Sequence, residues 1–386
     1  MAMKRYQIGV LFSNSGSYGV VSGSMRNGAL LAFDEINRTG AFDFKMEAVV
    51  ADPAGDPGQY SVLAGRLIDK GIRHVVGCYT SSSRKDVIPL FEKHDALLWY
   101  PSHYEGFESS TNVIYTGAAP NQHIIPLIEY LLGHIGKRAY CVGSNYIWSW
   151  ENNRILREGL AAAGGAVVAE RYFAVGETDH SKVILEILDG KPDFIFNTLI
   201  GTSAYHFFRD FRAACAARGI DQSVLLPIAS CSLSEPELAE IGAGAMDGHI
   251  SSSVYFSTIA TETNQRFVDA YRRLFPSGPS VSADAEASYA AVKLLAASIA
   301  AAGGYEVDAV RQAAAQQRIA APQGNIWIDG QTSHAYLTPR IGRSNNSGSF
   351  DVAFEARQPV RPDPYLILTT PRYAALSRRP KLKLVP

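Results

Sequence analysis

One short stretch decides the fold, because in it an apolar strand opens into a helix through consecutive hydroxyl residues: Gly77-Cys78-Tyr79-Thr80-Ser81-Ser82-Ser83-Arg84-Lys85. A second apolar run opens in the same way, at Leu97-Leu98-Trp99-Tyr100-Pro101-Ser102-His103-Tyr104-Glu105-Gly106-Phe107-Glu108. Repeated strand-then-helix units are typical of a parallel sheet. Since the carboxyl ends of parallel strands meet at one edge, the polar residues that follow both strands predict a pocket for a small polar molecule.

The length and composition indicate an ordered protein of two lobes. The chain has 386 residues, 47% of them hydrophobic and 19% charged, and single domains usually contain roughly 100–200 residues. The formal net charge of -1 gives no sustained field that would recruit nucleic acid or an anionic membrane. We therefore expect a ligand that is small and neutral or balanced in charge, with no direct nucleic-acid binding and no membrane insertion.

The cysteines and the N-terminus bear on metal binding and on the location of the protein in the cell. Cys78, Cys141, Cys215 and Cys231 form no CxxC pair and have no histidine at zinc spacing, so we expect buried thiols, no metal and no cofactor. The first apolar run, residues 8–12, is shorter than the apolar region of a secretion signal, which has roughly 7–15 residues. This predicts a cytoplasmic protein, or a periplasmic one if a leader has been removed.

Alternating patterns predict the α/β architecture. Strands are expected at residues 6–12, 44–52, 74–79 and 96–100, with helices between them, and a second series follows the small residues 116–120. The strands of that series are expected at residues 139–143, 167–173, 193–200 and 225–230. The sequence therefore predicts two doubly wound parallel-sheet lobes with a cleft between them.

The remaining residues are expected to complete both lobes. Helical patterns at 262–274, 285–302 and 307–316 are assigned to the first lobe. Antiparallel strands are expected at 325–329, 335–341 and 350–354, with a turn at 345–348. The basic stretch 378–383 is expected to be a solvated end, with docking onto an acidic partner as the alternative.

Motifs for catalysis are missing from the sequence. There is no HExxH, Walker loop, GxSxG elbow or GxGxxG after a strand. His103 stands alone, and Cys231 has no basic group nearby in sequence to activate it. We therefore expect binding without catalysis, whereas an amide hydrolase would need a nucleophile and base that the pattern does not supply.

Hydroxyl and aromatic residues that follow the strands are the candidate ligand contacts. They are Tyr79, Ser81, Tyr100, Ser102, Tyr146, Trp148, Thr202 and Ser230. Serine at a strand-to-helix junction also serves as a helix cap, which we favour for Ser83, Ser203 and Ser234. For Ser81 and Ser102 the cap and the pocket are equally consistent with the pattern.

Several unusual stretches carry a family resemblance. They are Gly77-Cys78-Tyr79, Ser81, Arg84-Lys85, Tyr100-Pro101, Tyr104-Glu105-Gly106-Phe107-Glu108, Ala119-Pro120-Asn121-Gln122, Gly143-Ser144, Tyr146-Ile147 and Arg361-Pro362-Asp363-Pro364-Tyr365. From Tyr6 to Tyr365 the sequence resembles type I solute-binding proteins of the amide and urea branch. The resemblance implies three crossing segments near Ala118, Val254 and Gln323. The implied lobes are residues 1–118 with 255–323, and 119–254 with 324–386.

The resemblance also implies a function. By matched position, Tyr79, Ser81, Tyr100, Ser102 and Tyr146 would line a pocket for a small amide or urea-like ligand, with Thr202, Ser230 and Tyr255 as looser candidates. In the branch's cytoplasmic sensors the ligand releases an RNA-binding antiterminator. A sensor of an amidase or nitrile-metabolism operon, in a homo-oligomer or a hetero-complex, is therefore expected. The alternative is a periplasmic receptor of an ABC transporter for urea or short amides.

Two departures from that branch bear on the ligand. Trp148-Ser149-Trp150 replaces a segment with an aromatic, a proline and a basic residue, which should change the size of the pocket or the shape of its lid. Asp284 stands near the position of a large aromatic residue in the sensors. This implies a ligand more polar than a short aliphatic amide.

Overall fold

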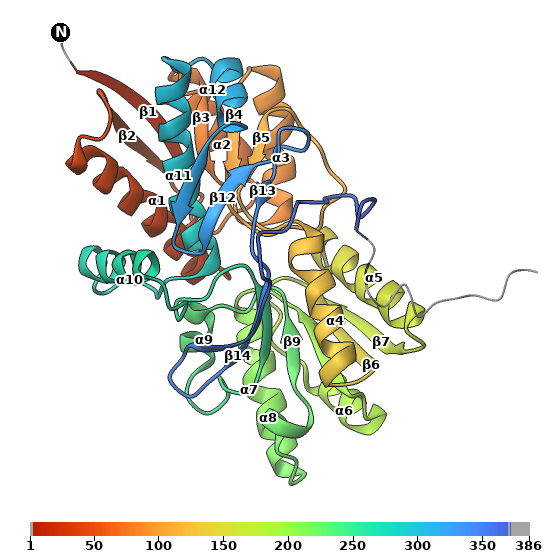
Figure 1. Ribbon diagram of the computed structural model, residues 1–386. Coiled ribbons are helices and arrows are strands. Elements are labelled where there is room, and N and C mark those ends of the chain that lie inside the picture. Colours follow the sequence, from red (N-terminus) through yellow and green to blue (C-terminus); the bar gives the residue numbers. More distant parts are fainter. Residues whose placement is uncertain (1–2, 370, 372–386) are drawn as a thin grey trace, which may run out of the picture.

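The computed structural model describes residues 3–369 and 371, which form two lobes joined by several segments of chain (Figure 1). The first lobe contains a parallel sheet with the strand order β2-β1-β3-β4-β5. Its strands are β1 (Lys4–Leu11), β2 (Phe44–Ala51), β3 (His74–Gly77), β4 (Leu97–Tyr100) and β5 (Val113–Tyr115). The four expected strands are confirmed, and β5 is an additional one. The basic stretch 378–383 lies outside the described residues.

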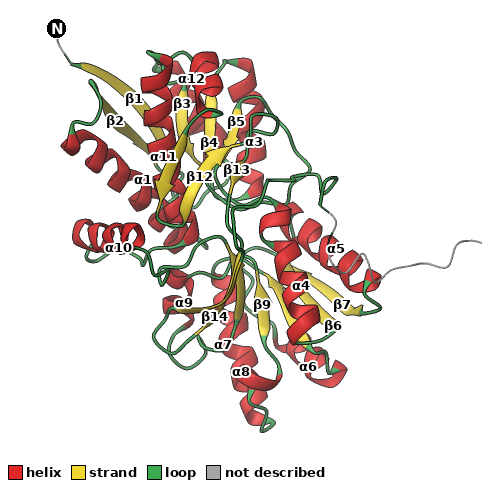
Figure 2. Cartoon of the chain, viewed as in Figure 1, coloured by secondary structure: helices red, strands yellow, loops and turns green. Residues whose placement is uncertain are grey.

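Helices cover both faces of this sheet (Figure 2). They are α1 (Gly19–Thr39), α2 (Gln59–Asp69), α3 (Ser81–Lys93), α11 (Ala283–Ala302) and α12 (Val307–Ala314), with α10 (Glu262–Leu274) alongside. Helices α1 and α11 touch closely at Gly28, where a Cβ would lie 2.1 Å from the carbonyl oxygen of Ala285. By length and composition α11 could cross a membrane, but 67% of that segment is buried. It is a core helix.

The second lobe is built on a seven-stranded sheet with the order β15-β14-β10-β9-β8-β6-β7. The strands are β6 (Arg138–Ser144), β7 (Ala166–Phe173), β8 (Phe194–Thr198), β9 (Ile228–Ser230), β10 (Ile250–Ser253), β14 (Arg340–Ser344) and β15 (Phe350–Glu355). Strands β6 to β10 are parallel, whereas β14 and β15 form the expected antiparallel hairpin. The turn between them is closed by hydrogen bonds to the Asn345 side chain.

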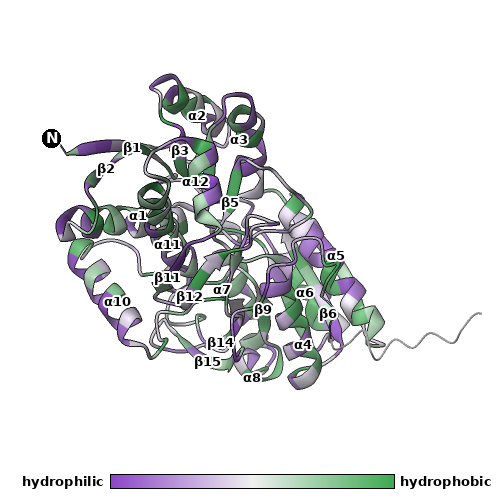
Figure 3. Cartoon of the chain, turned by 45° about the horizontal axis from the view of Figure 1, so that its top comes forward, coloured by the Kyte–Doolittle hydropathy of each residue, from purple (hydrophilic) through white to green (hydrophobic). Residues whose placement is uncertain are grey.

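The helices of the second lobe follow its strands. They are η1 (Pro120–Gln122), α4 (Ile124–His134), α5 (Ile147–Ala162), α6 (Ser181–Gly190), α7 (Thr202–Ala217), α8 (Gln222–Leu225) and α9 (Glu235–Ile241). Helix α5 carries hydrophilic and hydrophobic residues in alternation along its length (Figure 3). This is the pattern of a helix that buries one face against a sheet.

A third, antiparallel sheet lies beside the first lobe, on both sides of the expected boundary at residue 324. It consists of β11 (Arg318–Ala321), β12 (Gly324–Ile328) and β13 (Ala335–Tyr336), and a bridge from Tyr115 to His334 joins it to β5. The chain therefore stays with the first lobe until residue 336 and enters the second sheet at β14. Later, the amide of Phe107 donates to the carbonyl oxygen of Pro364 at 3.0 Å, so the stretch after β15 also contacts the first lobe.

One buried arginine holds two of the crossing segments together. The Arg340 guanidinium donates to the carbonyl oxygens of Val254 at 2.5 Å and Gln323 at 3.0 Å. It also donates to Glu355 at 3.0 Å. Val254 begins the second crossing, and Arg340 itself ends the third. The hinge is therefore cross-linked by a single side chain.

Candidate ligand-binding site

Helix N-termini from both lobes surround two small cavities. The first cavity, of about 10 Å³, is lined by Tyr79, Thr80, Ser81, Ser102, His103, Tyr146, Trp148, Ile200 and Ser232. The second, of about 20 Å³, is lined by Pro101, His103, Gly117, Ala118, His123, Cys231, Ser252, Ser253, Val254, Ala283, Asp284 and Ala287. Tyr79, Ser81, Tyr146, Ile200, Ser232 and Asp284 lie within a few residues of the starts of α3, α5, α7, α9 and α11, whereas Ser102 and His103 follow β4. Because a helix N-terminus carries partial positive charge and free N–H groups, such an arrangement suits ligands with oxygen acceptors.

Five of the expected contacts lie together in the first cavity. They are Tyr79, Ser81, Ser102, Tyr146 and Trp148. The first three come from the first lobe, and the aromatic pair comes from the start of α5 in the second. The two aromatic rings of α5 are stacked, with centroids 6.3 Å apart.

Four other expected contacts are outside both cavities, because their hydroxyls have other partners. Tyr100 donates to the carbonyl oxygen of Tyr79 at 2.8 Å, and Tyr255 donates to the Asn264 side chain at 2.7 Å. The hydroxyl of Thr202 lies 2.9 Å from that of Ser17. Ser230 accepts hydrogen bonds from the amides of Ser232 and Leu233 at 3.0 and 3.3 Å. In the structure each of these four side chains therefore stabilises its surroundings rather than lining either cavity.

The helix-cap expectations were right for one serine of three. Ser234 caps α9, and Glu237 completes its capping box. At α3 the cap is Thr80, which accepts from the amide of Ser83 at 3.2 Å. Ser203 accepts from the amide of Gly176 at 2.9 Å and does not cap α7.

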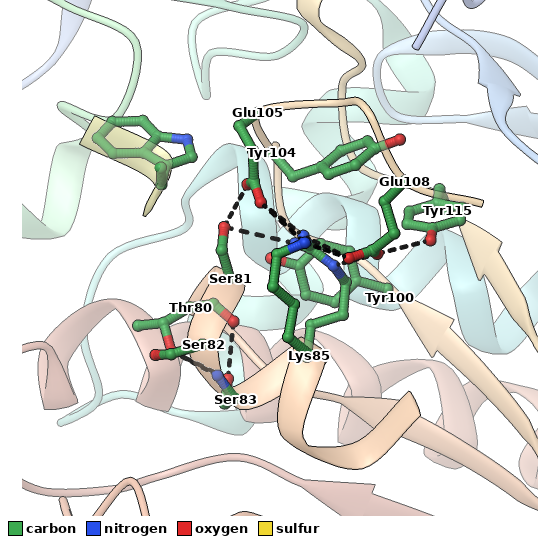
Figure 4. Close-up of polar contacts among 12 residues, drawn as sticks. Thr80, Ser81, Ser82, Ser83, Lys85, Tyr100, Tyr104, Glu105, Glu108 and Tyr115 are labelled. Atoms are coloured by element: carbon green, nitrogen blue, oxygen red, sulfur yellow. Dashed lines mark hydrogen bonds and ion pairs between the residues drawn. The ribbon is translucent and has the colours of Figure 1, made fainter. Parts of the chain in front are cut away.

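A buried ion-pair cluster fixes the hydroxyl of Ser81. Ser81 donates to Glu105, which also accepts from the fully buried Arg84 at 2.9 Å. Arg84 in turn donates to Glu108 at 2.7 Å, and Lys85 contacts the same carboxylate at 2.7 Å (Figure 4). Arg84 and Lys85 hold the pKa of Glu108 down at about 2 against its burial. Since the hydroxyl proton of Ser81 is directed at Glu105, the serine faces the cavity as an acceptor.

Two buried polar atoms of the first cavity have no hydrogen-bond partner among the described residues. They are Oγ of Ser102 and Nε1 of Trp148, on side chains that are almost completely buried. Most buried polar atoms in folded proteins are paired, so these two unpaired atoms, one from each lobe, mark a place where a ligand could be bound. The indole can only donate.

Burial keeps the tyrosines of the site neutral. It raises the pKa of Tyr79 and of Tyr146 well above the ordinary value. Burial also raises the pKa of nearby Glu237 to about 8. The site is therefore lined by neutral hydroxyls at neutral pH.

The lobes touch on both sides of the cavities. On one side the amide of Thr202 donates to the carbonyl oxygen of Ser17 at 3.0 Å. On the other, the guanidinium of Arg154 lies 5.0 Å from the ring centre of Phe107. Gly201, at φ 59°, allows the first contact, because a Cβ there would lie 2.0 Å from the oxygen of Ser17.

The structure also brings in residues that the candidate list lacked. His103 lines both cavities, and Ile200 and Ser232 complete the first one. Ser232 lies just beyond the end of β9, where the strand-edge argument could have found it. Within residues 3–369, no three His, Cys, Asp or Glu side chains are grouped as metal ligands would be.

The comparisons with known proteins agree with this architecture. The model of the periplasmic binding protein domain matches residues 6–371. The chain belongs to the periplasmic binding protein family. Its fold is the type I fold of that family, with parallel α/β lobes.

Several proteins that are similar to this chain are named as binding proteins. The Leu/Ile/Val-binding protein BraC3 of Rhizobium johnstonii is 26% identical over 194 residues, which are 49% of this chain and 53% of the relative. The chain thus matches about half the length of that relative. A solute-binding protein from R. palustris in complex with benzoate is 20% identical with a TM-score of 0.81, covering 93% of this chain and 98% of the other.

A third relative is LivJ from Streptococcus pneumoniae, in complex with isoleucine. It is 21% identical with a TM-score of 0.77 and covers 92% of this chain and 99% of its own. At such identities the two solved structures share the fold with this chain. The amide and urea branch expected from the sequence is not shown by these relatives, whereas membership of the periplasmic binding protein family is shown.

Proposed function

We propose that this protein is the receptor that delivers a small carbonyl compound, of the amide or urea class, to a membrane transporter. The observation that carries the proposal is the polarity of the first cavity. Ser81 presents an acceptor, and Ser102 and Trp148 present unpaired donors. A primary amide is complementary, since its oxygen accepts and its NH2 group donates.

Charge favours an amide over an acid of the same size. The residues that line the two cavities include no Lys or Arg, and Arg84 is paired with Glu105 and Glu108. A carboxylate ligand would be buried without a cationic partner, which is costly, although helix N-termini would offset part of that cost. Neutral ligands should therefore bind more tightly.

The relatives favour transport over gene regulation. The three described above are named as binding or transport proteins, and none is named as a sensor that controls an antiterminator. Delivery to a transporter places the protein outside the cytoplasm. Ligand binding would hold the two lobes closed, since a ligand shifts an equilibrium toward the state that it binds better.

A thermal-shift and calorimetry screen tests the ligand class. Acetamide, propionamide and urea should raise the melting temperature, and acetate and propionate should not, because a ligand stabilises only the state that it binds. Leucine and benzoate are included as the ligand types of the relatives. Binding of acids or amino acids alone, with no response to any amide, would overturn the proposal.

Uptake by cells separates the two roles. Deleting the gene should abolish high-affinity uptake of a labelled amide and leave expression of amide-degrading enzymes unchanged. Unchanged uptake with altered enzyme expression would instead support the sensor.

A further inference from the structure

His103 divides what could be one larger site. Its side chain lines both cavities. The ring lies between Trp148 and His123, with ring centroids 5.4 and 5.8 Å away. Because this one side chain lines both spaces, the two cavities adjoin each other at His103.

The second cavity presents hydrogen-bond acceptors. Within residues 3–369, the Asp284 carboxylate has one side-chain contact, from Oδ1 to Nδ1 of His103 at 3.3 Å. Asp284 is 5% exposed, and it is the one carboxylate among the residues that line this cavity. A buried carboxylate requires donors.

The tautomer of His123 follows from its contact. Its Nε2 lies 3.0 Å from the carbonyl oxygen of Tyr104, and a carbonyl can only accept, so Nε2 carries the hydrogen. The Nδ1 atom of this buried ring has no partner among the described residues, and in the neutral ring it is an acceptor. Asp284 and His123 are therefore both hydrogen-bond acceptors, and a ligand in the second cavity would have to supply the donors.

We propose that the solute has a second, cationic end, a protonated amine, which enters the second cavity against Asp284 and His123 when His103 moves aside. The inference rests on the proposed function, because the carbonyl end is the one received by Ser81, Ser102 and Trp148. The substrate class is then a short amide that also carries an amine. The lining offers such a cation one carboxylate and no competing Lys or Arg.

Matched ligand pairs test this in the wild-type protein. Glycinamide is compared with propionamide, and β-alaninamide with butyramide, since each pair differs in shape very little but in charge by one unit. In calorimetry the better-fitting amine should bind about tenfold more tightly than its neutral counterpart, the gain expected of one close charge pair in a partly shielded site. The gain should shrink as salt is raised.

The variant Asp284→Asn assigns the effect to its residue. It should remove the preference for the amine, so that the two ligands of each pair bind with similar affinity. Asp308→Asn is the matched control, because Asp308 also lies in the first turn of a first-lobe helix but is exposed and remote from the cavities. That variant should keep the preference.

Three outcomes would overturn the inference. The first is that amines bind no better than their neutral counterparts in the wild type. The second is that Asp284→Asn weakens the binding of both ligands of a pair equally. In either case the amide receptor still stands if the neutral amides bind. If no amide binds, with or without an amine, both proposals fail. Because the ligand pairs are compared first in the wild type, poor folding of a variant does not remove the test.

Discussion

Ser81 and Glu105 are 24 residues apart in the sequence, and the hydroxyl of the serine donates to the carboxylate. This hydrogen bond decides how the serine meets a ligand, because a hydroxyl has a single proton to give. With that proton directed at Glu105, Ser81 can only accept from the cavity. A residue that does not line the cavity thereby sets the polarity of one that does.

The first prediction concerns that relationship. Glu105→Gln should destabilise the protein by about 3 kcal/mol, because the buried Arg84 loses a charged partner. Amide binding should also weaken, since a glutamine can donate to Ser81 and reverse its polarity. Urea denaturation and calorimetry measure the two effects. Glu47→Gln, in an exposed pair with Arg5, should cost no more than about 1 kcal/mol; equal losses in the two variants would contradict the role of the buried cluster.

The second prediction separates binding from stability at Ser102. Its unpaired hydroxyl is buried, so Ser102→Ala should leave stability unchanged or slightly raised while weakening amide binding by about 1–3 kcal/mol. Ser298→Ala is the control, because Ser298 is buried on α11 and donates to the carbonyl oxygen of Leu294. Calorimetry should show unaltered affinity for the control. Equal affinity in both variants would remove Ser102 from the site.

The third prediction concerns closure. Gly201→Ala should prevent the lobes from meeting, because its Cβ would collide with the oxygen of Ser17. Small-angle X-ray scattering should then show no decrease in the radius of gyration on adding ligand. Gly40→Ala carries the strain of a similar positive φ, 62°, but no atom lies within 4 Å of its new Cβ. This control should compact as the wild type does; compaction in both variants would contradict the contact.

The fourth prediction is a dependence on pH. Burial raises the pKa of Glu237 to about 8, whereas an unfolded glutamate titrates near ~4.3. The folded state keeps a proton that the unfolded state releases, so this contribution to stability is full below the unfolded pKa and is lost as the pH rises through the folded pKa.

Glu237→Gln isolates that contribution, because glutamine has no proton to lose and can keep the capping box with Ser234. The stability of the variant relative to the wild type should increase by a few kcal/mol between about pH 5 and pH 8. Denaturation curves across that range provide the measurement. The exposed Glu240→Gln should show no such trend; a flat difference for Glu237→Gln would contradict a buried, protonated carboxyl.

Much of the fold could be predicted because apolar runs and helical periods are local. Strands β5 and β10 could not, since β5 has three residues and β10 is largely serine. The bridge from Tyr115 to His334 could not be predicted either, because it joins residues that no local pattern connects.

In the site, too, the contacts of single side chains could not be predicted from local sequence patterns. Tyr79 and Tyr100 follow or end apolar strands in the same way, but only Tyr79 reaches the cavity, since the hydroxyl of Tyr100 turns to a backbone oxygen. The hydrogen-bond direction at Ser81 and the tautomer of His123 depend on contacts with distant residues. The residue types therefore predicted which segments meet at the cavities. The donor and acceptor roles of the single atoms could be assigned only from the structure.

Arg340 has a consequence for how this protein moves. Arg340 ends the third crossing, and its guanidinium is bonded to the backbone at Val254, where the second crossing begins, and at Gln323 in the first lobe. The second and third crossings therefore cannot slide past each other without breaking these hydrogen bonds. Opening should therefore be a rigid-body rotation of one lobe about this point, in which every residue of that lobe turns through the same angle.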